Sequence, residues 1–402
     1  LSTTTGNYNT SNGSGSLAVN TTGSSNVAIG LNALVANTTA SNNTAVGTFS
    51  LTANTTGHSN VAMGLNALND NTTASYNTSV GTYSMDKTTT GSNNTAVGYQ
   101  ALELNTTAYQ NTAVGVTSLK STTTGADNTG VGFSALFANT TGYNNTAVGK
   151  SSLSTTTTGA QNTAVGMQSL LSNTTGYNNS AVSTYALKAN TTGHSNTAVG
   201  LSSLQVNTTG NGNSSVGNSA GDSITTGENN AFLGLRAGHT FTTGSNNVCV
   251  GYEAGGSSTT DNNQLWIARS SGAVNSAGVW VYGDASGRCY QGNNSSSWST
   301  TSDERIKKDI VDSPNGLAKI DAMQVRNFNY KTQEEITEGG FTACDSEGLQ
   351  TGVIAQELES VLPECIVESD DGMKRVNIDP IFWSMVKAIQ ELSARIEVLE
   401  GE

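Results

Sequence analysis

Hydrophobic and polar positions recur with a period of 17 residues over the first part of the chain. Glycines stand at positions 13, 30, 47, 64, 81, 98, 115, 132, 149, 166, 200, 217, 234 and 251, and Ser183 takes the one intervening place. This makes fifteen copies of roughly N-T-A-V-G-x-x-[A/S]-L-x-x-N-T-T-G-x-x, without an insertion. A fixed period over so many copies is typical of a solenoid.

The columns of this repeat predict short strands joined by turns. The residue before the glycine is aliphatic in fourteen copies, and Leu or Met lies four residues after it in twelve, from Leu17 to Leu204. Thr, Asn and Gly are poor helix formers. N-T-A-V predicts a strand and N-T-T-G predicts a turn. We therefore predict a mainly β fold, a parallel β-solenoid or β-roll with one repeat per coil, over residues 1–256.

One asparagine column is unbroken. Asn occurs four residues before the glycine in all fifteen copies, from Asn9 to Asn247. Stacked coils place identical residues about 4.8 Å apart, so fifteen coils make a rod of roughly 70 Å. Buried asparagines at that spacing can hydrogen-bond along the axis as a ladder.

The interior of such a coil is thin. Each repeat offers about one Val, one Leu and one or two Ala, and burying a Val or Leu stabilises by roughly 1.5–3 kcal/mol. Ordering 17 residues costs on the order of 1–2 kcal/mol for each residue. We therefore expect a homo-oligomer, with a homotrimer favoured, in which several chains bury more surface together.

Two other interpretations of the repeats are weaker. The N-T-T triplets match N-glycosylation acceptors, but their regular spacing favours turn and ladder chemistry. Threonine columns are also used in ice-binding solenoids. Neighbours on a strand face opposite ways, so the paired threonines cannot both line one flat face.

Residues 257–301 interrupt the repeat and carry aromatic residues at a higher density than residues 1–256, including tryptophans, which the repeats lack. We interpret this segment as a small β connector that caps the open end of the solenoid. The alternative is a sugar-binding tip, because aromatic rings stack on sugars. The aromatic residues concerned are Trp266, Trp280, Tyr282, Tyr290 and Trp298.

Residues 302–402 form an ordinary charged region that ends in a helical pattern. Apolar residues there are spaced 3, 4, 3, 4 and 3 apart, which is the a/d seam of a coiled coil. A terminal clamp makes physical sense, because 17-residue copies can mispair by one coil and keep almost every contact. The seam residues are Phe382, Met385, Ile389, Leu392, Ile396 and Leu399.

Charge and composition exclude several classes of protein. The net charge is −13, and residues from Ser302 onward contribute 21 acidic and 10 basic residues, or −11 of it. No basic stripe exists, so we expect no nucleic-acid partner. We expect no membrane insertion either, because no segment approaches the roughly 20 apolar residues of a span. No signal peptide opens the chain, and since it begins with Leu1 rather than Met we expect a piece of something longer.

Metal and disulfide chemistry are not expected. The four cysteines have no C-x-x-C spacing and are too few for a disulfide framework, so we favour free thiols. His58 and His194 share a phase but lie eight coils apart, and His239 lies at another phase. We predict no metal site and no cofactor.

The border at residue 301 allows two local interpretations. Thr301 and Glu304 fit a capping box that opens a helix, with solvated lysines after it. Alternatively, Ser302 and Lys307 form a serine–lysine pair, in which a neutral lysine takes the hydroxyl proton. Five residues on a regular helix span 500°, so the pair needs Ser302 outside the first turn or a lysine from a neighbouring chain.

Three ordered motifs resemble a known module. They are "SDERIKKDI" from Ser302, "IDAMQVRNFNYK" at 320–331 and "TGVIAQELESVLPE" at 351–364, followed by the closing helix. Together they resemble the endosialidase-type intramolecular chaperone found at the C-terminus of phage tailspikes and tail fibres. The A-V-G rhythm of the repeats also resembles the heads of trimeric autotransporter adhesins, which are trimers of parallel β-rolls.

The resemblance implies an autoproteolytic C-terminal module. It implies that the module brings three chains together and then cuts itself off at the Thr301–Ser302 bond, with Ser302 as nucleophile and Lys307 as general base. This would be a serine–lysine endopeptidase acting once on its own chain, without turnover on a substrate.

The expected function follows from the resemblance. We expect a structural phage tail-fibre protein in the virion, made in the host cytoplasm, that attaches to a host cell-surface receptor, with a glycan favoured, and contacts other virion tail proteins. The alternative is a bacterial trimeric surface adhesin that uses the same module. A glycan-degrading tailspike is disfavoured, because the repeats carry few carboxylates and none recurs as a pair.

Overall fold

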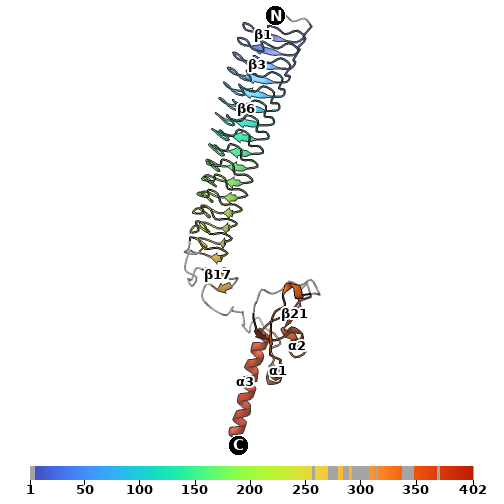
Figure 1. The fold of residues 1–402 in the computed structure, drawn as a ribbon, viewed down its shortest axis with the longest axis vertical. Helices are drawn as coiled ribbons and strands as arrows, with labels where there is room; N and C mark the ends of the chain where they lie inside the picture. Colours follow the sequence, from blue (N-terminus) through green and yellow to red (C-terminus); the bar gives the residue numbers. More distant parts are fainter. Residues whose placement is uncertain are drawn as a thin grey trace. The chain divides into compact units, whose positions relative to one another are not determined.

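A computed structural model of the chain describes residues 5–255, 259–269, 279–283, 289–291, 308–313, 316–336, 348–368 and 372–401. Of Val279, Tyr290 and Gln291 it describes the backbone only. The chain divides into two compact units, Leu1–Trp298 and Ser299–Glu402. The first is the solenoid, drawn from blue to yellow in Figure 1, and the second carries helices α1 to α3.

The solenoid is built from short parallel strands, one in each 17-residue coil. Fifteen of them have three residues, and β16 has four. The strands are β1 (Thr10–Asn12), β2 (Val27–Ile29), β3 (Thr44–Val46), β4 (Val61–Met63), β5 (Thr78–Val80), β6 (Thr95–Val97), β7 (Thr112–Val114), β8 (Thr129–Val131), β9 (Thr146–Val148), β10 (Thr163–Val165), β11 (Ser180–Val182), β12 (Thr197–Val199), β13 (Ser214–Val216), β14 (Ala231–Leu233), β15 (Val248–Val250) and β16 (Leu265–Ala268).

The register between coils confirms the predicted repeat. Each strand pairs in parallel with the strand 17 residues later, as in Thr44 with Val61 and Val148 with Val165. The pairing continues one coil beyond the sequence repeat, because Val248 of β15 pairs with Leu265 of β16. The mainly β, parallel solenoid fold predicted from the period is therefore confirmed, and successive coils of the same chain pair with each other.

The glycine after each strand is required by the stacking. Gly98 has a φ of +141°, and a Cβ added there would lie 2.5 Å from the carbonyl oxygen of Gly115 in the next coil. An L-residue is strained at that backbone conformation and also collides with the neighbouring coil. Ser183 alone departs from glycine in this column, and it holds a φ of +120°.

The apolar core consists of two columns, in which a larger side chain in one column is matched by a smaller one in the other. In most coils a buried Ala at the centre of the strand, such as Ala147, packs with the buried Leu four residues after the glycine, such as Leu153. Near the end of the solenoid the strand carries Phe232 instead, and Gly238 replaces the leucine. A Cβ on Gly238 would lie 2.3 Å from the Phe232 ring, so the glycine makes room for the larger side chain.

The predicted asparagine ladder is confirmed. Asn162 is fully buried, and both its backbone N–H and its side-chain Nδ2 donate to Oδ1 of Asn145, at 3.0 and 3.1 Å. Its Nδ2 also donates to the carbonyl of Gly176 at 2.9 Å. The side-chain amide of Asn162 is thereby paired, as burial of polar groups requires.

A second ladder runs through the N-T-T turns. Asn37 Nδ2 donates to Asn20 Oδ1 at 2.9 Å, and Asn54 Nδ2 donates to Asn37 Oδ1 at 3.0 Å. These turn asparagines are fully buried. The regular N-T-T triplets therefore serve turn and ladder chemistry, as the spacing indicated.

One expectation about the core is wrong. The aliphatic residue before each glycine, assigned above to the interior, points outward: Val148 is 37% exposed and Leu233 is 54% exposed. Successive strand residues face opposite ways, and the preceding Ala already occupies the inward position. The solenoid interior is thus thinner than the sequence suggested, and its aliphatic column lies on the surface.

The strands after β15 close the described solenoid. β16 pairs antiparallel with β17 (Val279–Gly283), which pairs antiparallel with β18 (Cys289–Gln291). Trp266 is 4% exposed over the last coils and packs on Tyr282, with ring centroids 4.6 Å apart. These contacts favour the capping interpretation for Trp266, while Trp280 is 60% exposed and Trp298 lies outside the described residues.

The second unit is a small α+β fold. It contains α1 (Gly316–Ala322), β19 (Arg326–Phe328), a 3-10 turn η2 (Gln333–Glu335), β20 (Gln350–Gly352), α2 (Ala355–Glu359), η3 (Pro363–Cys365), β21 (Ile366–Glu368), β22 (Lys374–Val376) and α3 (Asp379–Glu400). β19 pairs antiparallel with β20, and β21 with β22. Its small core is formed by the buried Leu358, Leu362 and Cys365.

Candidate functional site: the C-terminal unit and the apolar surfaces

A carboxylate fixes helix α3 to helix α1. Glu391 of α3 accepts hydrogen bonds from the backbone N–H groups of Gly316 and Leu317, both at 2.9 Å. The N–H groups at the start of a helix have no carbonyl partner within that helix, and this end of the helix favours a negative charge. The two hydrogen bonds hold the pKa of Glu391 below its usual range.

Surface ion pairs connect the other elements of this unit. Arg326 on β19 binds Glu357 on α2 through two hydrogen bonds, at 2.9 and 3.0 Å, and this contact lowers the pKa of Glu357. Lys319 of α1 lies 2.7 Å from Glu364 of η3, and its hydrogen bond lowers the pKa of Glu364. Exposed pairs of this kind contribute little stability, but they orient the helices around the small core.

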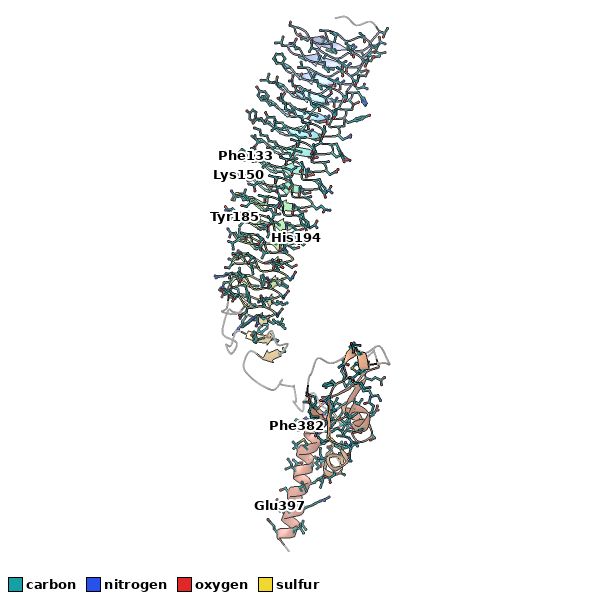
Figure 2. The ribbon with its side chains drawn as sticks, in the orientation of Figure 1. Phe133, Lys150, Tyr185, His194, Phe382 and Glu397 are labelled. Carbon is teal, nitrogen blue, oxygen red and sulfur yellow. The ribbon has the colours of Figure 1, made fainter. Side chains whose placement is uncertain are left out.

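The predicted seam lies on one continuous helix. All six of its residues are on α3, and each is 44–72% exposed. Ser384 and Ala388, which are buried, occupy other positions of the helix, and a Cβ on Gly316 of α1 would lie 2.5 Å from the backbone nitrogen of Ala388. Helix α1 therefore covers one side of α3, while the seam remains uncovered in the single chain. Figure 2 labels Phe382 near the start of this helix and Glu397 near its end.

The predicted catalytic residues lie outside the described part of the chain. Thr301, Ser302, Glu304 and Lys307 belong to the undescribed segment 292–307, so their roles and the cleavage site stay predictions. The described chain resumes at Lys308, which is exposed. The later motifs are described: "TGVIAQELESVLPE" forms the end of β20, helix α2 and the start of η3.

Sequence reasoning missed an exposed apolar stripe on the solenoid. Two columns, one residue before and one residue after the glycine, carry large apolar side chains that are 36–54% exposed. The first column ends each strand and the second begins the turn after the glycine, so the two columns flank the point where the coil leaves the strand. We call this set the apolar stripe: Ile29, Leu31, Met63, Leu65, Val97, Tyr99, Val114, Val116, Phe133, Val148, Val165, Met167, Val182, Val199, Leu201, Val216, Leu233, Leu235 and Tyr252.

The sequence does contain a signal for this stripe. After the glycine, large apolar residues are interrupted by polar ones, as in Leu31, Leu65 and Tyr99, with Thr48 and Thr82 between them. A core column would be filled in every coil, as the Leu column is. A column with polar interruptions instead indicates a surface position.

The described residues also bear on metal binding, membrane insertion and thiol chemistry. Among them, no group of three or more His, Cys, Asp or Glu side chains is placed to hold a metal ion. None of the described helices is long and apolar enough to cross a membrane. Cys249, Cys289 and Cys365 are free thiols, and burial raises the pKa of Cys249 to about 12. Cys344 lies outside the described residues.

Comparison with known proteins bears on the second unit. Residues 302–367 match the model of a protein family described as chaperone of endosialidase. No solved structure matches the chain.

The fold and this match together define the class of protein. It is a repeat solenoid followed by an intramolecular chaperone. Residues 302–367 carry the match to the chaperone-of-endosialidase family that the three motifs predicted. The match begins at Ser302, the residue assigned above as nucleophile.

Proposed function

We propose that this protein is the shaft of a homotrimeric phage tail fibre that serves host attachment. The observation that carries the proposal is the apolar stripe, which repeats with the coil over most of the solenoid. Such a surface is much larger than the scattered apolar residues of a soluble monomer. The stripe therefore requires a partner that covers it along its length.

A second copy of the same chain fits the stripe best. A partner must present apolar side chains at the spacing of successive coils, about 4.8 Å, over many coils. A parallel copy in register does so without any further requirement. Because each stripe residue is already about half covered, burying the rest contributes roughly 1 kcal/mol for each Val or Leu.

The helix α3 supports the same arrangement. Its uncovered seam has the spacing that packs against identical helices. The stripe is two columns wide, which suits chains that meet around one axis, and the coiled-coil seam suits the same symmetry. We propose that the chaperone unit aligns three chains from their C-terminal ends before the solenoids close on each other.

The proposed chemistry follows the predicted pair. Ser302 attacks the carbonyl carbon of Thr301, and Lys307 takes the hydroxyl proton and passes it to the departing amine. The chain up to Thr301 is then held as an ester on the Ser302 oxygen. Water hydrolyses this ester, releasing the shaft with a free carboxylate and the chaperone with Ser302 at its N-terminus.

Sedimentation and intact mass test the proposal. We expect the wild-type shaft to sediment as a trimer with a mass that ends at Thr301, and Ser302→Ala to stay uncut at 41.2 kDa for each chain while remaining trimeric. Val165→Lys with Val182→Lys places charges in the stripe and should dissociate the trimer. The matched control changes Thr158 and Thr175, which are exposed in another column, to Lys. A monomeric wild type would refute the assembly, and an uncut wild type would refute the cleavage.

A further inference from the structure

Three tyrosines form an exposed row on the solenoid. Tyr109, Tyr143 and Tyr177 are 34 residues apart, so they occupy the same position in alternate coils. They are 50%, 50% and 43% exposed, and each lies two residues before an asparagine of the first ladder. Nothing in the core requires an aromatic residue there, because other coils place Ser or Ala at this position.

The backbone under this row is fixed. The N–H of Gln161 donates to the carbonyl of Tyr143 at 3.0 Å, and the N–H of Ser195 donates to that of Tyr177 at 3.1 Å. Asn144 donates in the same way to Ala126, at 3.2 Å. Such coil-to-coil bonds place successive coils about 4.8 Å apart, so the tyrosines repeat about every 9.6 Å.

The coil between each pair of tyrosines carries an alanine. Ala126 lies between Tyr109 and Tyr143, and Ala160 lies between Tyr143 and Tyr177. Both alanines are less than a tenth exposed. No side chain beyond Cβ therefore rises from these two coils at this position, so no larger side chain of this column stands between neighbouring tyrosines.

One coil beyond Tyr177, a second ring stands at the same position of the coil. His194 follows Tyr177 in the next coil at the same position, and the two rings stack with centroids 4.6 Å apart and planes 14° from parallel. A flat ring is therefore accommodated beside a tyrosine of this row.

Polar side chains border the row. The position after each tyrosine or alanine is exposed and carries an amide or carboxylate group, and its left-handed backbone, with φ of 54–59°, fixes where the side chain starts. Amides and carboxylates can bond sugar hydroxyls as donors and acceptors. These residues are Gln110, Asp127, Asn144, Gln161 and Asn178.

From this geometry we propose that the row binds a neutral polysaccharide, with pyranose rings stacking on the exposed rings of Tyr109, Tyr143 and Tyr177. The C–H groups of a pyranose face are attracted to the negative face of an aromatic ring, and tyrosine adds a polar hydroxyl at its tip. Asp127 is the charged residue of the row, so an anionic glycan is disfavoured. Repeated weak contacts along one polymer add up through multivalency.

This inference deepens the attachment role in the proposed function and rests on it. The row and the apolar stripe occupy different columns, separated by the asparagine ladder and the strand. In Figure 2 His194 lies at the opposite edge of the solenoid from Phe133 and Lys150, which share the column after the glycine. Chains that meet through the stripe thus leave the row free to bind.

Affinity electrophoresis of the full-length protein tests the inference. The gels contain dextran, mannan, a β-linked galactan or soluble starch as neutral probes, and polysialic acid as the anionic probe. We expect at least one neutral polysaccharide to retard the protein, and Tyr143→Ala to weaken that association at least tenfold. Tyr185→Ala is the matched control, since Tyr185 lies in another column beside Lys188, and it should bind as the wild type does.

A second variant tests whether the faces of the tyrosine rings must be open for binding. Ala126→His with Ala160→His should abolish retardation, because histidine would stack on the tyrosines as His194 does. The coil accepts histidine at this position, as His58 and His194 show. Unchanged binding by this variant, retardation by polysialic acid instead, or no retardation by any neutral probe would overturn the inference.

The two proposals fail separately. A sedimenting trimer that no neutral polysaccharide retards overturns the sugar site and leaves the assembly intact. If the protein is a monomer that a neutral polysaccharide still retards, and Tyr143→Ala removes this retardation, the assembly is overturned and the sugar site is supported.

Discussion

Asn145 offers the sharpest test of how the solenoid is held together. It is fully buried in the middle of the first ladder. Its Nδ2 donates to Asn128 Oδ1 at 3.2 Å and to the Gly159 carbonyl at 2.9 Å. Its Oδ1 accepts from the backbone N–H of Asn162 at 3.0 Å and from Asn162 Nδ2 at 3.1 Å. All four bonds lie inside the coil.

Asn145→Ala removes these bonds and leaves two buried backbone groups unpaired. They are the N–H of Asn162 and the carbonyl of Gly159, and each costs about 1–3 kcal/mol when it loses its partner in the interior. We therefore expect the coils around position 145 to lose about 2–6 kcal/mol of local stability. A loss of this size should not depend on pH between 4 and 8, because no titrating group changes.

Asn145→Asp gives a different signature. The carboxylate still accepts from Asn162, but it cannot donate to Gly159 or Asn128, and its charge is buried. Burial raises its folded-state pKa above the unfolded value of about 3.9. The folded variant thus binds a proton more readily than the unfolded chain, so its deficit is largest above the folded pKa. The deficit shrinks as the pH falls towards the unfolded value.

Hydrogen exchange read by mass spectrometry measures this effect locally, because repeat proteins open in parts. Peptides that span residues 140–165 should exchange at least tenfold faster in both variants at pH 7. The matched control is Asn144→Asp, an exposed neighbour whose side chain does not belong to the ladder, and it should exchange as the wild type does. If Asn145→Asp exchanged no faster than Asn144→Asp at pH 7, the ladder would not be what stabilises the coil.

Two further predictions concern single positions. Ser183→Gly should slow local hydrogen exchange severalfold, because Ser183 holds a φ of +120° at a cost of about 1–3 kcal/mol. Gly200→Ser should speed local exchange, because its Cβ would lie 2.4 Å from the Gly217 carbonyl oxygen. Equal exchange in both variants would contradict the strain argument. Glu391→Gln should remove an acid-sensitive step from the C-terminal unit. The pKa of Glu391 is lower in the folded state, so its contact stabilises the unit above the unfolded pKa of about 4.3, and this stability is lost as the pH falls through the folded pKa. Circular dichroism measures the acid transition. Identical transitions in the wild type and the variant would count against the α1–α3 contact.

Much of the solenoid followed from the sequence because its determinants are local and repeated. The unbroken asparagine column indicated a ladder, and the 17-residue period fixed the register of Val148 on Val165. The chaperone motifs were recognised from short ordered matches, and the family match from residue 302 confirms the recognition. The seam on α3 was predicted as a spacing, and the structure shows that its residues are exposed on one helix.

The sidedness of the coil could not be read in this way. In A-V-G both Ala and Val are apolar, so composition cannot say which one points inward. The answer depends on where the chain turns, and the turn is set by backbone conformations such as the φ of +52° at Leu136. The apolar stripe followed only once Val148 and its equivalents were found outside.

The sequence by itself determined the period, the strand and turn positions, the ladder residues and the kind of C-terminal domain, because each depends on residues that are neighbours in the chain or copies of one another. Only the tertiary structure decided which columns face solvent. Stacking brings residues 17 and 34 apart to fixed distances, and this turns Val148 into part of a continuous apolar surface and Tyr143 into part of an evenly spaced row. The side that each residue faces is a property of the closed coil, and a column of letters does not contain it.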